Sequence, residues 1–216
     1  MAAREKSLGC PRPYRLGKRQ EATDQSRARI LDAARDLLAK EGVAEFSMDA
    51  VARHAGVTRQ TIHNQFGARP ELIEALFDRM ATRGGIEGLA VAMQEPDPIV
   101  MLTKFVEVFT GFWSSDRVAI RRIHGLAALD PELGRIDRAR NERRRMAASR
   151  VVDAFIRRFG KPVALDRADA IDLLFTATSF DFFDSFAASR APESVSSFIV
   201  RLVLASLGYW HGVLSS

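Results

Sequence analysis

The sequence has a single cysteine, Cys10, among its 216 residues. One cysteine excludes a disulfide framework within the chain and any zinc site made of several cysteines. No run approaches the roughly 20 apolar residues that a membrane-spanning helix needs, and the charged N-terminal stretch lacks the apolar core of a signal peptide. We therefore expect a soluble protein of the cytoplasm that does not contact the membrane.

The motifs of common enzyme chemistry are also missing. The sequence has no Gly-x-Ser-x-Gly elbow, no glycine loop that would cradle a phosphate and no two-glutamate di-metal motif. His124 and His211 stand far from other catalytic candidates in the sequence. His54 and His63 lie across a predicted turn with no acidic or cysteine cluster beside them, which argues against a metal site. We predict no catalytic residue, no cofactor and no metal.

Hydrophobic residues make up 47% of the chain and charged residues 27%, so the chain can bury a substantial core. The formal net charge is +5. Residues 1–23 carry six basic and two acidic side chains and so contribute +4 of that total. This basic arm is either a solvated, disordered tail or a segment that binds an anionic partner, and both interpretations stay open.

Apolar residues recur at helical spacing along most of the chain, and no convincing strand alternation appears. The pattern predicts helices at 24–41, 48–55, 59–66, 69–80, 99–113, 117–129, 132–159, 167–188 and 194–210. The fold class is therefore all-α. We divide the chain into a basic arm (1–23), a first helical domain (24–80) and a larger second one (81–216).

Residues 47–66 hold the most specific pattern. Two short predicted helices flank a tight turn at Gly56, where a positive φ costs glycine little. This is a helix-turn-helix, whose second helix can lie in the DNA major groove. Its apolar residues can pack inward, which leaves a polar set pointing outward: Arg59, Gln60, Thr61, His63 and Asn64. Arginine and glutamine are the side chains that pair bidentately with guanine and adenine edges.

On these residues the chain resembles the DNA-binding domain of the TetR/AcrR family of transcriptional regulators. The resemblance covers residues 27–80 and includes Ile30-Leu-Asp-Ala-Ala, Phe46-Ser-Met, Val51-Ala-Arg-His-Ala-Gly-Val and Thr58-Arg-Gln-Thr-Ile. It implies an N-terminal three-helix helix-turn-helix domain followed by a larger helical domain for ligand binding and dimerisation.

The resemblance also implies roles for single residues in binding double-stranded DNA. Bases would be read by Arg59, Gln60, Thr61 and Asn64, and the DNA backbone would be held by Ser47, Thr58, His63 and Arg69. The sequence departs from the family at His63 and Asn64, where tyrosines are more usual, and at Arg69, where a lysine is. A plainer alternative for Ser47 and Thr58 is that they only cap helices.

Aromatic residues are concentrated in the second half of the chain. Phe105, Phe109 and Trp113 recur every four residues, so they lie along one stripe of a helix. Such a stripe is either packed core or the wall of a cavity, and we predict a ligand site there, with His124 as its polar group. The basic run 135–158 is either a solvated face or an attraction for an anionic ligand.

We predict a homodimeric repressor that binds a palindromic operator and is released by a small apolar or amphipathic ligand. The dimer would form through 167–188 and 194–210, each of which has more apolar surface than one core can cover. The alternative is an interaction protein that uses DNA as a scaffold and is controlled by a protein partner. A closed apolar cavity would favour the first, and a filled core with an exposed apolar patch the second.

Overall fold

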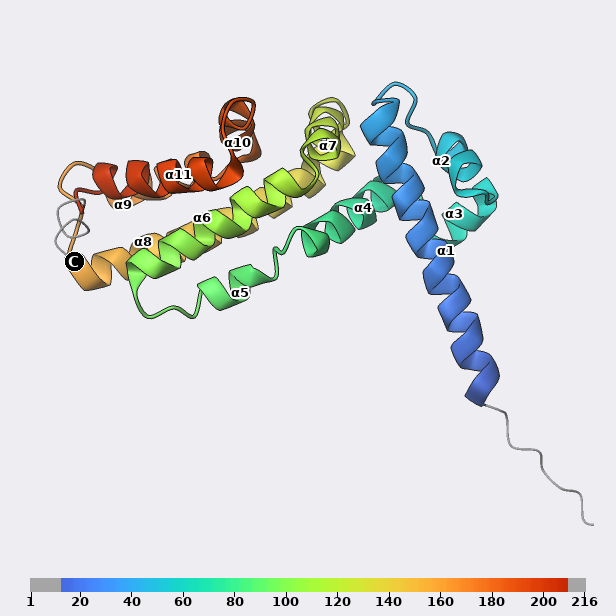
Figure 1. Cartoon of the computed structure of the whole chain (residues 1–216), viewed down its shortest axis with the longest axis horizontal. Helices are drawn as coiled ribbons and strands as arrows, with labels where there is room; N and C mark the ends of the chain where they lie inside the picture. The colour runs from blue at the N-terminus through green and yellow to red at the C-terminus, as the bar shows by residue number, and fades with distance from the viewer. Residues whose placement is uncertain (1–12, 210–216) are drawn as a thin grey trace, which may run out of the picture.

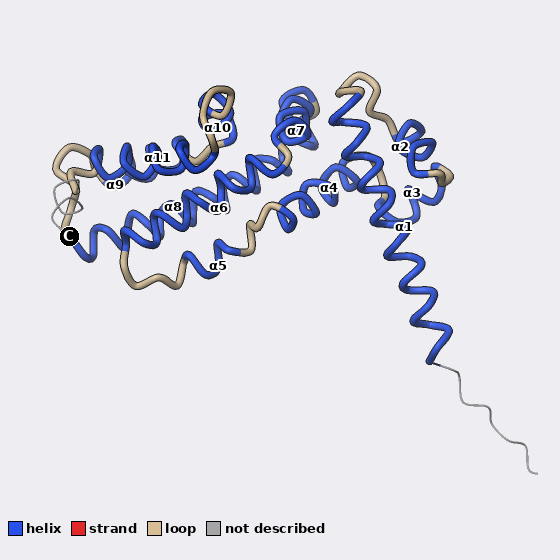
Figure 2. Tube along the Cα trace, viewed as in Figure 1, coloured by secondary structure: helices blue, strands red, loops and turns tan. Residues whose placement is uncertain are grey.

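The computed structural model describes residues 13–209, and all regular structure in that range is helical (Figure 2). The basic residues of 1–12 lie outside the described residues, as do Cys10, Trp210 and His211. The helices are α1 (Pro13–Lys40), α2 (Met48–Ala55), α3 (Arg59–Phe66), α4 (Arg69–Arg83), α5 (Gly88–Ala92), α6 (Pro98–Ser115), α7 (Arg117–Leu129), α8 (Pro131–Phe159), α9 (Arg167–Ala177), α10 (Phe180–Phe186) and α11 (Pro192–Ser206). None of the described helices is long and apolar enough to cross a membrane.

Helices α1 to α3 form one end of the molecule, and α4 leads from them toward the rest (Figure 1). The long helices α6 and α8 run through the second part of the chain. Helix α9 packs on α8 and α11 packs on α6, so these two helices cover one side of that pair. Helix α5 lies along α6 away from them.

One continuous hydrophobic core holds both parts together, because its buried residues run from Ile30 in α1 to Leu207 after α11. Helix α4 joins the two parts. Its residues Leu72, Ile73, Leu76 and Met80 are all buried. Our predicted domain limit at residue 80 falls inside this helix, which continues to Arg83.

The first helix begins at Pro13, eleven residues before the start at residue 24 that the apolar pattern predicts. Residues 13–23 of the basic arm are therefore helical. Gly17 is the only glycine within α1, and no proline or glycine interrupts the chain between residues 18 and 40, so a helix nucleated by the buried face can extend toward the N-terminus at little cost. Gln20 also donates to Asp24 one turn later, at 3.1 Å.

The predicted helix 167–188 is two helices, α9 and α10, separated at Thr178 and Ser179. The Thr178 carbonyl accepts a hydrogen bond from Nε1 of Trp113 at 3.0 Å. Ser179 then caps α10 by accepting a hydrogen bond from the Phe182 backbone N–H at 3.2 Å. The break therefore depends on a contact 65 residues away in the sequence.

Candidate nucleic-acid interface and cavity

The first helix of the helix-turn-helix is fixed at both ends by local sequence. The Ser47 hydroxyl accepts a hydrogen bond from the Ala50 N–H at 3.2 Å. Gly56 ends α2 with φ 64°, in the left-handed region where a Cβ would be strained. Ala50, Val51 and Ala52 are buried, so the helix is anchored by its inner face.

The second helix, α3, is capped by Thr58, whose side chain accepts a hydrogen bond from the Thr61 N–H at 3.1 Å. Ile62 and Phe66 are its buried residues. The Arg27 guanidinium of α1 stacks on the Phe66 ring at 4.2 Å and donates to the Gln65 carbonyl at 2.9 Å. The inner face of α3 is therefore held against α1, and its other face is left to solvent.

The outward face of α3 carries the side chains that we predict to read bases. Arg59, Gln60 and Asn64 are exposed, and Thr61 is half-buried. Gln60 donates from Nε2 to Oδ1 of Asn64 at 2.7 Å. The hydroxyls of Thr58 and Thr61 lie 2.9 Å apart. The structure thus places Arg59, Gln60, Thr61 and Asn64 on one short surface of α3.

Arg59 also contacts an acidic residue that we did not include in the site. Its guanidinium lies 3.2 Å from Oδ2 of Asp49 in the first turn of α2, and both side chains are more than half exposed. Asp49 sits two residues after Ser47, so its negative charge lies at the surface where the DNA backbone is expected. The charge was visible in the sequence, but its contact with Arg59 was not.

His63 is exposed at the end of α3, and its Nδ1 lies 3.0 Å from the Gly67 carbonyl. Its Nε2 atom has no hydrogen bond within residues 13–209. His54, on α2, bridges the Ala50 carbonyl at 3.1 Å and Oε1 of Glu41 at 3.0 Å. His54 therefore fixes α2 to the end of α1, whereas His63 keeps a ring nitrogen for a ligand.

Arg69 occupies a different environment from the other predicted DNA contacts. Its guanidinium lies 3.4 Å from Oδ2 of Asp130 and 5.7 Å from the centre of the Phe46 ring. Asp130 caps α8 through the Glu132 and Leu133 N–H groups. Arg69 thus links the DNA-binding end to the start of α8, and its side chain is one-third exposed.

A partly open cavity of about 280 Å³ lies between α4, α5, α6, α7 and α8. Its aromatic wall is made of Phe77, Phe109, Phe112 and Trp113, and His124 also lines it. The His124 ring stacks on Phe180 at 5.0 Å and meets the Trp113 ring edge-to-face at 5.9 Å. Burial lowers the pKa of His124, and its Nε2 has no hydrogen-bond partner in the described structure.

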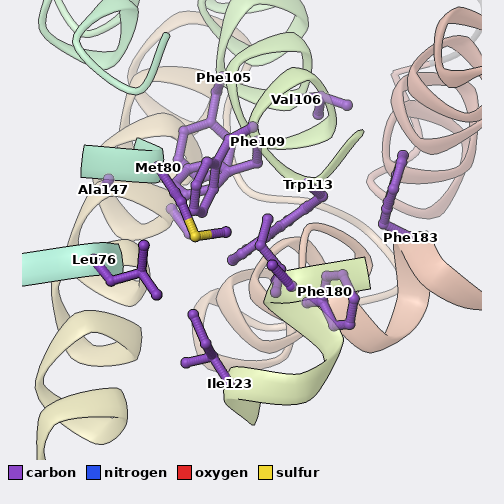
Figure 3. Packing of buried hydrophobic residues seen from close by; sticks show 14 of the residues in the cluster. Leu76, Met80, Phe105, Val106, Phe109, Trp113, Ile123, Ala147, Phe180 and Phe183 are labelled. Carbon is purple, nitrogen blue, oxygen red and sulfur yellow. The ribbon is translucent and has the colours of Figure 1, made fainter. Parts of the chain in front are cut away.

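Phe105 lies apart from the other residues of the predicted ligand set. It is fully buried and does not line the cavity. Its ring packs on Phe109 at 5.0 Å, and both rings belong to the buried core drawn in Figure 3. The four-residue stripe is real, but the cavity lies at the Phe109 and Trp113 end of it, so Phe105 belongs to the core.

Comparison with known proteins places this geometry in a family. The model of bacterial regulatory proteins of the tetR family matches residues 30–76. The transcriptional regulator TtgR of Pseudomonas putida is 32% identical over 88 residues, which are 40% of this chain and 42% of TtgR. The alignment therefore spans less than half of that relative.

Two further matches extend along the chain. The regulator EthR of Mycolicibacterium smegmatis is 25% identical over 189 residues, 85% of this chain and 87% of EthR. A TetR-like regulator from Rhodococcus sp. RHA1 has the same fold, with a TM-score of 0.62, 21% identity, and coverage of 88% of this chain and 97% of that one. Residues 30–76 therefore match the DNA-binding domain of the TetR family of bacterial transcriptional regulators, and the described chain as a whole has the fold of a TetR-like regulator.

Proposed function

We propose that the protein is a repressor that binds a palindromic operator as a homodimer and is released by a small apolar or amphipathic ligand. The observation that carries this proposal is the pairing of two sites in one chain. An exposed polar helix face, suited to reading bases, lies at one end. An aromatic-walled cavity of about 280 Å³ lies in the other part.

We call the outward face of α3 the reading face: Arg59, Gln60, Thr61 and Asn64. These side chains can contact DNA at a low cost in free energy. An exposed ion pair such as Arg59 with Asp49 is worth about 0–1 kcal/mol, so Arg59 can leave it for a guanine edge. Gln60 uses one Nε2 hydrogen for Asn64 and keeps its other hydrogen and Oε1, the two groups that an adenine pairs with. Asn64 therefore orients Gln60 in addition to offering its own amide.

Two observations support a dimer: the small size of the reading face, and the apolar side chains of α9 and α11 that the protomer does not fully bury. One recognition helix covers too few base pairs for useful specificity in a genome, so two-fold symmetry is expected. Leu173 of α9 and Phe198 and Leu202 of α11 are half-buried and do not belong to the buried core. A second copy would cover them. Leu204 and Leu207, in the predicted dimer segment 194–210, are buried in the protomer itself.

The cavity favours a small ligand over a protein partner as the controlling molecule. Its wall is aromatic and partly enclosed, which suits a compact molecule that enters it. The exposed large apolar side chains are instead spread over separate elements, among them Val91 on α5, Leu129 on α7 and Met146 on α8. Single exposed apolar residues do not make a docking patch.

Helix α7 supplies a route from the cavity to the DNA-binding end. It carries His124 at the cavity, and Arg122 donates to the Leu38 carbonyl of α1. At its start, Asp116 accepts two hydrogen bonds from Arg35 of α1, at 2.6 and 3.1 Å. A ligand that prefers one position of α7 would therefore bias the position of α1 and, in a dimer, the spacing of the two recognition helices.

The proposal is tested by selecting bound sequences from a random double-stranded DNA library with the full chain. We expect a palindrome whose half-sites are centred about 34–36 Å apart, or a multiple of the helical turn. The bound protein should protect the selected site from nuclease cleavage as one continuous footprint. Enrichment of a single unrepeated half-site, or of no sequence at all, would contradict the proposal.

A further inference from the structure

Two arginines one turn apart on α8, Arg140 and Arg144, line the cavity and differ in how their charge is balanced. Arg140 lies 2.6 Å from Oδ1 of Asp78 and 3.7 Å from Oε1 of Glu74, and it stacks on the Phe77 ring at 4.3 Å. Its charge is neutralised by α4. Arg144 has no carboxylate within ion-pair distance among residues 13–209.

Arg144 is the most deeply buried arginine that the structure describes, with 6% of its surface exposed. It donates from Nη1 to the Phe175 carbonyl and to the Thr178 hydroxyl, and from Nη2 to Oδ1 of Asn141 at 3.1 Å. These three bonds all go to neutral groups. Of the five guanidinium donors, the Nε–H is left without a partner, as is one of the Nη2 hydrogens.

A buried cation that has only neutral partners is costly for a folded protein. Burial lowers the pKa of Arg144 to about 10, while Asp137 and Asp181 counteract this without pairing with it. The wall of the cavity therefore holds a positive charge that the protein itself does not neutralise. An anion in the cavity would supply what is missing.

The other charges of the wall lead to the same conclusion. Its ionised side chains are three arginines and two aspartates, a balance of +1 with His124 neutral. Asp78 is occupied by Arg140, and Asp137 accepts a hydrogen bond from Asn141 at 2.9 Å. His124 adds a ring nitrogen, Nε2, that is buried and has no partner. The Nε–H groups of Arg140 and Arg144 also have no partner, and these donors favour an acceptor with negative charge.

We propose that the cavity binds a compact aromatic monocarboxylate, with its carboxylate at Arg144 and its ring against Phe109 and Trp113. The size fits, since about 280 Å³ corresponds to roughly nine water volumes of ~30 Å³, the room for a benzoate-sized molecule. This inference rests on the proposed function, because it names the chemical class of the ligand that would release the operator.

The test measures binding of benzoate and phenylacetate to the full chain by isothermal titration calorimetry, with benzamide and benzylamine as neutral and cationic counterparts. We expect the carboxylates to bind and the amide and amine to bind at least 10-fold more weakly, since charge-assisted hydrogen bonds are lost. Arg144→Gln should weaken carboxylate binding about 10- to 100-fold. Arg144→Lys keeps the positive charge but loses the paired N–H donors of the guanidinium. Its affinity for the carboxylates should lie between those of the unaltered protein and Arg144→Gln.

Arg145→Gln is the matched control, because Arg145 is the next residue on α8 but pairs with Asp172 and does not line the cavity. It should leave carboxylate binding unchanged. The comparison of benzoate with benzamide on the unaltered protein keeps the test valid if Arg144→Gln fails to fold. Equal binding of acid and amide, tighter binding of benzylamine, or no binding of either carboxylate at 10 mM would overturn the inference.

A separate DNA-binding measurement distinguishes this inference from the proposed function. Carboxylates that bind the cavity without weakening operator binding would support the ligand class and contradict release by ligand. Release of the operator by neutral aromatic molecules alone would support the proposed function and contradict the carboxylate.

Discussion

At the scale of single residues, Gln60 provides the sharpest test of the reading face. Gln60→Ala removes a bidentate amide that Asn64 holds in place, so preference at one position of each half-site should relax by about 1–3 kcal/mol. Affinity for random DNA should hardly change. The measurement is competition binding against a set of operators that carry each base at each position.

Gln65 offers a control of identical chemistry on the same helix. It is half-buried, and its Nε2 donates to Ser26 of α1 at 3.1 Å rather than to solvent. Gln65→Ala should therefore lower stability slightly and leave the base preference unchanged. If Gln60→Ala weakened operator and random DNA equally, Gln60 would be a backbone contact and the assignment would be wrong.

The residue types of the reading face and the helix caps could be predicted from the sequence because both depend on local chemistry. Ser47, Thr58 and Gly56 act within four residues of themselves. The state of Arg144 could not be predicted in this way. Its partners Phe175 and Thr178 lie more than 30 residues away, and its lack of a carboxylate is a property of the packed structure.

At the scale of the helices, the sequence pattern predicted which segments are helical better than where they break. The predicted apolar stripe of Phe105, Phe109 and Trp113 lies on the buried face of α6. The interruption at Thr178 was missed because residues 167–188 contain no proline or glycine, and Trp113 supplies the cause from another helix. Ser179, a good N-cap type, was the one local signal available.

Helices α9 and α11 carry the prediction about assembly. Leu202→Asp places a charge on the half-buried apolar face of α11, so a dimer that buries this face should dissociate. Because both half-sites must be bound at once, operator affinity should fall by at least 100-fold at nanomolar protein. Sedimentation velocity at micromolar concentration measures the first effect and fluorescence anisotropy the second.

Val91→Asp is the matched control for this change. Val91 is 59% exposed on α5, which lies away from α9 and α11 (Figure 1). The same substitution there should leave sedimentation and operator binding unaltered. A native protein that sediments as a monomer would contradict the dimer outright, whatever the variants do.

At the scale of the whole molecule, the shared core predicts one unfolding transition. The buried residues form one cluster through both parts, so the DNA-binding end should not melt separately. For about 200 ordered residues, the enthalpy of unfolding should be on the order of 140 kcal/mol near 60 °C. Differential scanning calorimetry at a fixed protein concentration would show this as a single peak. Two peaks would mean that α1 to α4 unfold independently.

The ion pair between Arg35 of α1 and Asp116 before α7 links the DNA-binding end to the rest of the molecule. A variant at Arg35 therefore tests the prediction of a single unfolding transition. Hydrogen bonds to Asp116 and Asp36 raise the pKa of Arg35 above its ordinary value. Arg35→Gln should lower the single Tm by about 2–4 °C for each kcal/mol that this half-buried pair contributes. Arg83→Gln, which breaks a more exposed pair with Asp32 inside the DNA-binding end, should change Tm by less.

Helix α4 has a consequence for any attempt to build hybrid regulators from this protein. Its residues Phe77 and Ala81 form part of the cavity wall, while Arg79 on the same helix pairs with Asp32 of α1 at 2.7 Å. In a hybrid joined at residue 80, Phe77 and the rest of the cavity wall would come from two different proteins. The apolar packing of α4 against its neighbours would change as well. Helix α4 therefore contributes to the cavity wall and to the contact with α1 at once, and a working hybrid would have to carry α4 whole and redesign the surface it meets on α6 and α8.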